Sequence, residues 1–175
     1  ILDLLERLNQ IKPVWVELGL QTIHERTARY IRRGYDLPVF ETAVSELRRR
    51  GIDIIVHTIL CLPGETKPDM LQTIQYLNRQ DIQGIKLQLL HILKDTDLAE
   101  IYASDPFPVP DPQEYYELLG ACISHLRPDI VIHRLTGDGP KELLIAPLWT
   151  CNKRQVLNQL QSYFKTHDIW QGKEY

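Results

Sequence analysis

Four short apolar runs separated by amphipathic segments restrict the folds that this sequence can adopt. The runs cover residues 14–20, 52–60, 85–90 and 130–135, and the first three begin 38 and 33 residues apart. That distance accommodates a strand, a helix and two turns, which is the length of a βαβ unit. The alternation therefore predicts an α/β protein built on a parallel sheet.

Helix-start signals fall between these runs. Four pairs of the capping type, in which the first residue caps the helix and the fourth reaches back, begin at Thr22, Thr66, Asp111 and Asn152. Pro38 suits the first turn of a further helix, because that position needs no backbone N–H donor. Each signal predicts a helix that starts at or just after the named residue.

The strand runs have one apolar face and one face that carries isolated polar residues. Trp15 and Glu17 alternate with valine and leucine, and His57 shares a face with Ile59. A doubly wound sheet is apolar on both faces, whereas the wall of a barrel around a ligand has this mixed pattern. We therefore expect a parallel-stranded, partial TIM-type barrel.

A proline-rich stretch, SDPFPVPDP at residues 104–112, divides the chain. It predicts an extended connection, because four prolines in so short a segment exclude a regular helix or strand. We place the barrel segment at residues 1–104 and a small α/β extension at residues 105–175. Within the extension we expect Trp149 to act as a packing anchor.

Composition excludes several classes of protein. The net charge of −3 argues against a bulk electrostatic attraction to nucleic acid, and no apolar run approaches the roughly 18 residues of a membrane span. The cysteines at positions 61, 122 and 151 are odd in number and widely spaced, so they predict neither a disulfide framework nor a zinc site. Core packing and a reducing cytoplasm suit them best.

Polar residues follow the first two strand runs, where ligands collect in parallel α/β folds. The amide of Gln21 can donate to and accept from a pair of hydroxyls, and His57 on the neighbouring strand can reach the same pair. Arg33 can hold a carboxylate with two parallel hydrogen bonds. Taken singly, such residues are more often solvated or structural, and only their order across consecutive units favours a binding site.

Three stretches carry a family resemblance: VELGLQTIHERTARYIRRGYD, HTILCLPGET and LLHILKDTDLA. They resemble the fourth, fifth and sixth βα units of the radical S-adenosylmethionine (radical SAM) superfamily. The most similar branch contains the Elongator catalytic subunit, the methylthiotransferases and oxygen-independent coproporphyrinogen oxidase. The extension, IHRLTGDGPKELLIAPLW and beyond, is similar to bacterial radical SAM proteins of uncertain role. The resemblance implies the C-terminal half of a (βα)6 barrel.

The same resemblance implies a cofactor chemistry and assigns residues to it. Family members hold a [4Fe-4S] cluster with a CxxxCxxC motif and cleave SAM reductively to methionine and a 5′-deoxyadenosyl radical. By position, Gln21 and His57 would hold the ribose of SAM, Arg33 its carboxylate, and Ile59 would pack near adenine. The LPGET turn would end its strand beneath the adenosine. Cys61 stands where relatives commonly have glycine.

The cluster motif itself is absent, since none of the three cysteines has the CxxxCxxC spacing. This chain alone should be inactive, and we expect the motif within about 150 residues upstream, given roughly 30 or more residues per unit. Two alternatives stay open. The chain could be a degraded relative that serves as a binding or scaffold module, or a barrel enzyme that uses TGDG as a phosphate loop.

The expected partners are SAM, an electron donor for the cluster and a substrate that resemblance suggests is tRNA. Arg134, Asp138 and Lys141 are candidate substrate-binding residues, and the alternative is a glycine-rich turn with solvated charges. No membrane partner is expected. A half barrel would expose a strand edge and its inner face, so we expect the isolated chain to self-associate through the region of Trp15.

Overall fold

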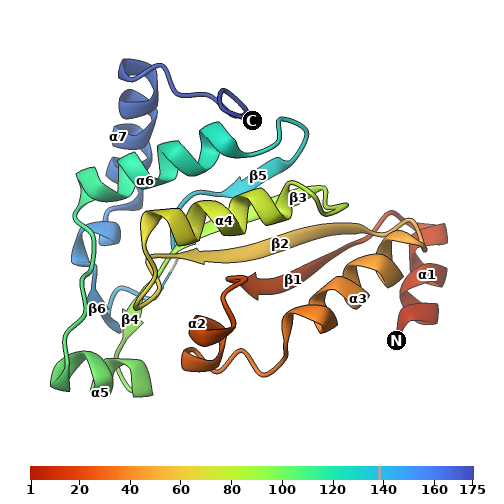
Figure 1. The fold of residues 1–175 in the computed structure, drawn as a ribbon, viewed down its shortest axis with the longest axis horizontal. Coiled ribbons are helices and arrows are strands. Elements are labelled where there is room, and N and C mark those ends of the chain that lie inside the picture. Colours follow the sequence, from red (N-terminus) through yellow and green to blue (C-terminus); the bar gives the residue numbers. More distant parts are fainter. Residues whose placement is uncertain (138) are drawn as a thin grey trace.

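The computed structural model describes residues 1–137 and 139–175 and places the four predicted strands in one parallel sheet (Figure 1). The strand order is β1-β2-β3-β5. Their bounds are Trp15–Gln21, Asp53–Leu60, Gly84–Leu89 and Val131–Arg134. Each strand lies within one residue of its predicted bounds or slightly inside them, so the α/β partial-barrel prediction is confirmed.

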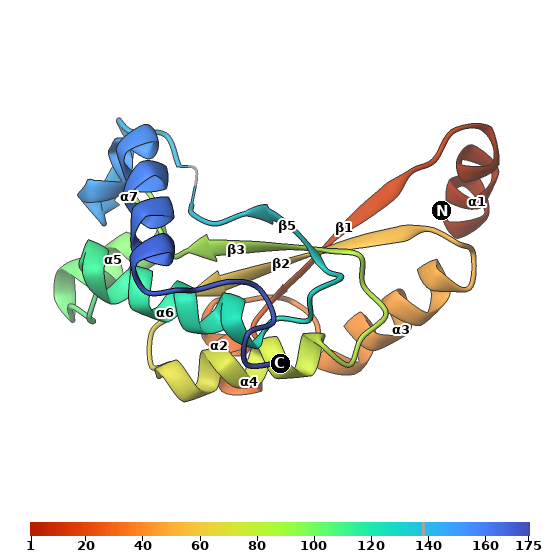
Figure 2. The same cartoon turned by 90° about the horizontal axis from the view of Figure 1, so that it is seen from above.

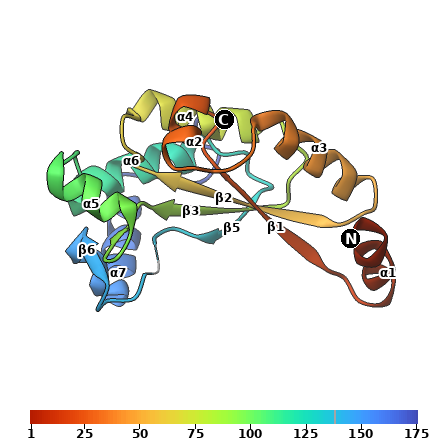
Figure 3. The same cartoon turned by 90° about the horizontal axis from the view of Figure 1, so that it is seen from below.

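Helices cover one face of this sheet. Those on the covered face are α2 (Glu25–Tyr30), α3 (Leu37–Arg48), α4 (Lys67–Leu77) and α6 (Pro112–His125) (Figures 2 and 3). The opposite face, which the sequence predicts to be polar, has no helix lying along its centre in either view. The remaining helices are α1 (Leu2–Ile11), α5 (Asp97–Ser104), η1 (Leu148–Cys151) and α7 (Lys153–Thr166).

The core lies between the sheet and the covering helices. Strand residues such as Ile54 and Leu87 are completely buried, and they belong to the same cluster as Phe40, Ile74 and Leu119 from the helices. Burying an aliphatic or aromatic side chain of this size stabilises a fold by about 1.5–3 kcal/mol. This packing holds the strand ends, and therefore the site, in fixed positions.

Three of the four predicted helix caps are confirmed. Asp111 and Glu114 form the reciprocal pair at α6, Thr66 pairs with Asp69 at α4, and Asn152 caps α7. The cap predicted at Thr22 is wrong, because α2 begins three residues later with His24 at the N-cap. Thr22 is instead buried, and its hydroxyl donates to Glu65 Oε1 at 2.5 Å.

The C-terminal part of the chain adds features that the sequence did not predict. Two short strands, β4 (Ile92–Leu93) and β6 (Leu144–Ala146), pair with each other in antiparallel orientation. Helix α5 precedes the proline-rich connection. Trp149 is an anchor as predicted, since its indole N–H donates to the carbonyl oxygen of Pro110 at 3.0 Å. The described helices include none with the length and apolar character that crossing a membrane requires.

Candidate cofactor site at the carboxyl ends of the strands

A cavity of about 480 Å³ lies at the carboxyl ends of β1 and β2. It brings together three of the four residues predicted to bind the cofactor: Gln21, Arg33 and Ile59. Its other lining residues are Gly19, Ile31, Arg32, Tyr35, Leu62 and Leu90. The cavity therefore combines an amide, two guanidinium groups and an apolar wall.

Gln21 reaches this cavity because β1 ends irregularly. The pairing between β1 and β2 shifts register between Gly19 and Gln21, and Gln21 has a φ of 59°. The side chain folds back so that its amide lies 2.5 Å from where a Cβ on Gly19 would stand. Its hydrogen bonds are satisfied when the amide nitrogen donates to the carbonyl oxygens of Leu20 and Gly19, at 3.1 and 3.2 Å. The amide oxygen then lies over Gly19 as an acceptor.

Arg33 is held by the protein more tightly than the sequence suggests. Its side chain is 2% exposed, and its guanidinium donates to the carbonyl oxygens of Tyr35, Thr22 and Leu20 and to the carboxylate of Glu25. These four hydrogen bonds tie the end of β1 to the loop after α2. The predicted pairing with a ligand carboxylate would add to, or displace, one of these contacts.

Glu25 fixes that guanidinium from the other side. Its Oε1 accepts from Arg33 Nη2 and from the backbone N–H of Leu37, both at 2.9 Å. The hydrogen bond from Leu37, together with the nearby charge of Arg33, holds the pKa of Glu25 below its usual value. The ionised carboxylate of Glu25 and the guanidinium of Arg33 therefore neutralise each other, and their contacts hold the loop between α2 and α3 in place.

Arg32, the adjacent residue, lines the same cavity with a more accessible side chain. It has a φ of 55°, it is 75% exposed, and it pairs with Asp97 at the start of α5. An exposed ion pair of this kind contributes little to stability and exchanges readily with other partners. Arg32 thus borders the cavity with a side chain that already has a carboxylate partner in Asp97.

His57 lies on the open face of the sheet but outside this cavity lining. Its Nε2 is 2.7 Å from Glu17 Oε2, and its Nδ1 is 3.1 Å from Gln88 Nε2. Lys86 Nζ lies 2.6 Å from both oxygens of Glu17. Chiefly because Lys86 donates to it, the Glu17 carboxylate has a pKa of about 2. The predicted contact between His57 and a ribose stays a prediction.

The LPGET turn lies beside the cavity and is held there by a contact with the loop after β1. Cys61 and Gly64 both have positive φ, of 64° and 79°, so Cys61 adopts a conformation that favours glycine. Glu65 accepts the hydroxyl hydrogen of Thr22 and is partly buried, which raises its pKa. This contact joins the loop after β2 to the loop after β1, and no local sequence pattern indicates it.

The predicted substrate residues lie elsewhere. Arg134 lines a separate cavity of about 570 Å³ together with Lys153 and Trp170, and Lys141 is exposed in the turn before β6. Asp138 lies outside the described residues. Neither Arg134 nor Lys141 lines the cavity that Gln21 borders.

The glycines of TGDG have a packing role. A Cβ on Gly137 would come within 2.5 Å of His91 Nε2, and a Cβ on Gly139 within 2.9 Å of His91 Nδ1. Contacts this short essentially never occur, so a side chain at either glycine would force the imidazole ring of His91 to move. Gly137 and Gly139 therefore make room for the His91 ring, and a phosphate contact at this segment stays a hypothesis.

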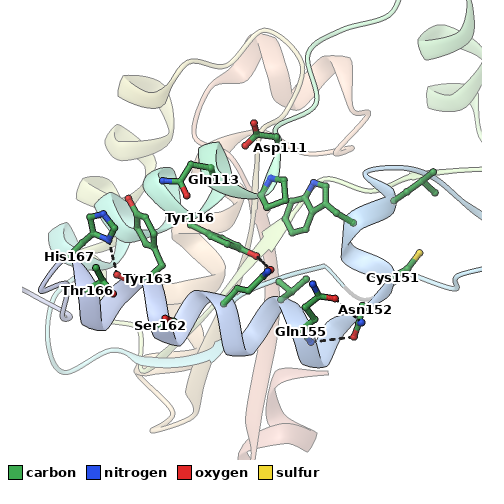
Figure 4. Close-up of a pocket in the computed structure, with 15 residues that line it drawn as sticks. Asp111, Gln113, Tyr116, Cys151, Asn152, Gln155, Ser162, Tyr163, Thr166 and His167 are labelled. Atoms are coloured by element: carbon green, nitrogen blue, oxygen red, sulfur yellow. Dashed lines mark hydrogen bonds between the residues drawn. The ribbon is translucent and has the colours of Figure 1, made fainter.

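A larger cavity, of about 830 Å³, lies between α6 and α7 (Figure 4). Tyr116, Trp149 and Tyr163 provide aromatic surface there, and the Tyr116 hydroxyl donates to Gln159 Oε1 at 2.9 Å. Asp111, the carboxylate in its lining, caps helix α6. The predicted cofactor residues do not line this cavity.

The cysteines provide no cluster site. Cys122 is completely buried and Cys61 partly so, and burial raises the pKa of both thiols to about 12. Over residues 1–137 and 139–175, no three His, Cys, Asp or Glu side chains group as metal ligands would. The residues that the structure describes therefore offer no ligand set for an iron–sulfur cluster.

Taken together, an open parallel sheet with a cavity at its strand ends, lined by an amide, guanidinium groups and apolar side chains, defines a partial TIM-type barrel. The sequence model of the Radical SAM superfamily matches residues 1–77, and that of the Radical SAM C-terminal domain matches residues 82–166. The chain belongs to the radical SAM superfamily.

Several known proteins are similar to this chain in sequence. The chain is 38% identical to the uncharacterized protein YtqA of Bacillus subtilis over 99% of its own length and 54% of YtqA, and 34% identical to YhcC of Escherichia coli over 97% and 55%. Elongator complex protein 3 of Schizosaccharomyces pombe is 23% identical, over 83% of this chain and 28% of that protein. The chain spans about half the length of YtqA and YhcC.

A solved structure shows the same fold. The Methanocaldococcus infernus Elp3 with an N-terminal deletion superimposes with a TM-score of 0.80, over 95% of this chain and 39% of that one. The sequence identity is 15%, so the likeness concerns the fold alone.

Proposed function

We propose that this chain forms the SAM-binding half of a radical SAM enzyme, with the cavity at the ends of β1 and β2 as the cofactor site. The observation that supports the proposal is that Gln21, Arg33 and Ile59, which the family resemblance assigns to one ligand, line the same cavity. Gln21 would accept a ribose hydroxyl, Arg33 would hold the carboxylate, and Ile59 would pack on adenine. When bound at a [4Fe-4S] cluster, SAM supplies a 5′-deoxyadenosyl radical that abstracts hydrogen from a substrate.

The cluster ligands belong, in this proposal, to a part of the protein outside residues 1–175, and an electron donor would reduce the cluster. The substrate that we propose is tRNA. The support for it is the similarity to Elongator complex protein 3, at 23% identity, together with the resemblance to branches that modify tRNA.

The binding test uses the complete gene product that carries this chain, purified without oxygen and with its cluster intact. SAM affinity is measured by calorimetry. Arg33→Ala should weaken it by roughly ten- to a hundredfold, as expected for a charged hydrogen bond, and Gln21→Ala by no more than about tenfold. Arg32→Ala is the matched control and should change affinity little. His57→Asp, which installs the group that many relatives use there, should keep affinity within about threefold.

Two outcomes would count against the proposal. If Arg32→Ala weakens binding and Arg33→Ala does not, the carboxylate belongs to Arg32. If the protein neither binds SAM nor forms 5′-deoxyadenosine when a reductant is added, the radical SAM function itself is wrong.

A further inference from the structure

Four polar side chains form a connected group on the face of the sheet that the helices leave open. This tetrad consists of Glu17 from β1, His57 from β2, and Lys86 and Gln88 from β3. The contacts run in sequence from Lys86 to Glu17 at 2.6 Å, to His57 at 2.7 Å, and to Gln88 at 3.1 Å. The group therefore spans three neighbouring strands of the sheet, β1, β2 and β3.

Charged groups of both signs lie near His57 on the neighbouring strands. Glu17 faces it from β1 and Lys86 from β3, and Lys86 contacts both carboxylate oxygens. On the far side of β3, strand β5 brings Arg134 into register with Lys86 and lays His133 over Gly84. Because Lys86 keeps Glu17 ionised, the carboxylate acts as an acceptor toward His57.

These contacts fix the tautomer of His57. Glu17 can only accept, so the ring must donate through Nε2–H, and Nδ1 is then left to accept from the Gln88 amide nitrogen. Both ring nitrogens are engaged in this arrangement. With this tautomer, the amide oxygen of Gln88 points away from the ring.

Gln88 lies next to the cofactor cavity. It is paired in register with Ile59, whose side chain lines that cavity, and Leu90, two residues further, lines it too. Gly19, the register partner of His57, carries the folded-back amide of Gln21. The amides of Gln21 and Gln88 thus flank His57 on the same face of the sheet.

We propose that Gln88, rather than His57, contacts the ribose hydroxyls of the bound cofactor, and that Glu17 and Lys86 act through His57 to aim the Gln88 amide oxygen at them. This rests on the SAM site proposed above and changes which side chain meets the ribose. Gln88 is a binding residue in this scheme, whereas Glu17, Lys86 and His57 are positioning residues.

The first test compares two probes on the protein with its cluster, SAM-free. Adenosine carries the ribose hydroxyls, and 2′,3′-dideoxyadenosine lacks them. Gln88→Met, which keeps the side-chain volume, should weaken adenosine binding by about three- to tenfold and leave the dideoxy compound unchanged. Gln75→Met, on the exposed side of α4, is the control and should change neither. Equal losses for both probes, or no loss, would overturn the proposal.

The second test reads the positioning role spectroscopically, through the ¹⁵N shifts of the His57 ring. The neutral ring should carry its proton on Nε2. In Glu17→Gln the new amide offers its oxygen to Lys86 and its N–H groups to His57, so the proton should move to Nδ1. The Gln88 oxygen would then turn toward the ring, and adenosine binding should fall about as far as in Gln88→Met.

The outcomes separate the two proposals. A protein that binds neither SAM nor adenosine contradicts the cofactor site itself. A protein that binds both, but whose His57 carries its proton on Nδ1, or whose adenosine affinity ignores Gln88→Met, keeps the cofactor site and contradicts only the role of Gln88.

Discussion

The amide of Gln21 occupies the space that a side chain on Gly19 would fill, with 2.5 Å between the amide and the position of a Cβ. Position 19 therefore favours glycine because the side chain of Gln21 folds back over it. Its own backbone lies within strand β1 and has none of the positive φ values that favour glycine. This separates the effect of a Cβ from any backbone strain.

Gly19→Ala should accordingly displace the Gln21 amide and weaken SAM binding by about two- to tenfold, the worth of one neutral hydrogen bond. A double-mutant cycle with Gln21→Ala checks the mechanism. If Gly19 acts only through Gln21, then adding Gly19→Ala to Gln21→Ala should cost no further affinity. Additive losses would show that Gly19 has a separate role.

The two neighbouring arginines should differ in their effect on stability. Arg33→Ala removes four hydrogen bonds from a buried guanidinium and leaves Glu25 without its ion-pair partner, so it should lower the free energy of unfolding by on the order of 3 kcal/mol. Arg32→Ala removes an exposed pair and should change it by less than about 1 kcal/mol. Urea unfolding of both variants checks this, and similar losses would contradict the contacts described for Arg33.

Much of the fold could be predicted from the sequence, because strands and helices follow local periodicity and capping chemistry. The strand runs, the parallel order and three helix caps depend on residues close together in the chain. The cofactor cavity was also predictable in outline, since parallel strands deliver their end residues to one edge of the sheet.

The contacts that the sequence did not show are those between distant residues. The pair Lys86 and Glu17 is separated by 69 positions, and the pair Thr22 and Glu65 by 43. Thr22 matches a helix cap locally, but burial and a distant carboxylate determine its actual role. The fold-back of Gln21 likewise depends on a register shift between two strands, which no local pattern encodes.

The lowered pKa of Glu17 leads us to expect a loss of stability in acid. Its pKa falls from 4.5 to about 2 on folding, mainly because Lys86 donates to it, so its stabilising effect is complete above about pH 4.5 and is lost as the pH falls through about 2. Relative to Glu17→Gln, the wild-type protein should therefore lose stability across that window. Chemical unfolding at several pH values checks this. Parallel curves for the two proteins would contradict the paired state of Glu17.

Glu65 predicts the opposite pH dependence. Burial raises its pKa above 4.5 although the hydrogen bond from Thr22 opposes this, so the protein is stabilised most below that pH and loses stability as the pH rises through the raised value and the buried carboxyl group becomes charged. Glu65→Gln keeps an oxygen for Thr22 without a charge. It should match the wild type near pH 4.5 and exceed it in stability at pH 8. Glu100→Gln, at an exposed position on α5, should show no such difference, and a wild type that gains on Glu65→Gln at high pH would contradict the prediction.

The free edge of β1 predicts self-association of the 175-residue chain. In the part of the chain that the structure describes, β1 pairs only with β2, and Trp15 on this edge strand is 61% exposed. Unpaired strand edges with apolar side chains template pairing with another chain, and a charged residue there blocks it. We expect dimers or larger species by light scattering at micromolar concentration, and Trp15→Lys should shift them toward monomer.

Trp170→Lys makes the same change at a residue 52% exposed near the C-terminus, away from the edge, and should leave association unchanged. A wild-type chain that stays monomeric at these concentrations would show that the β1 edge is protected without a partner.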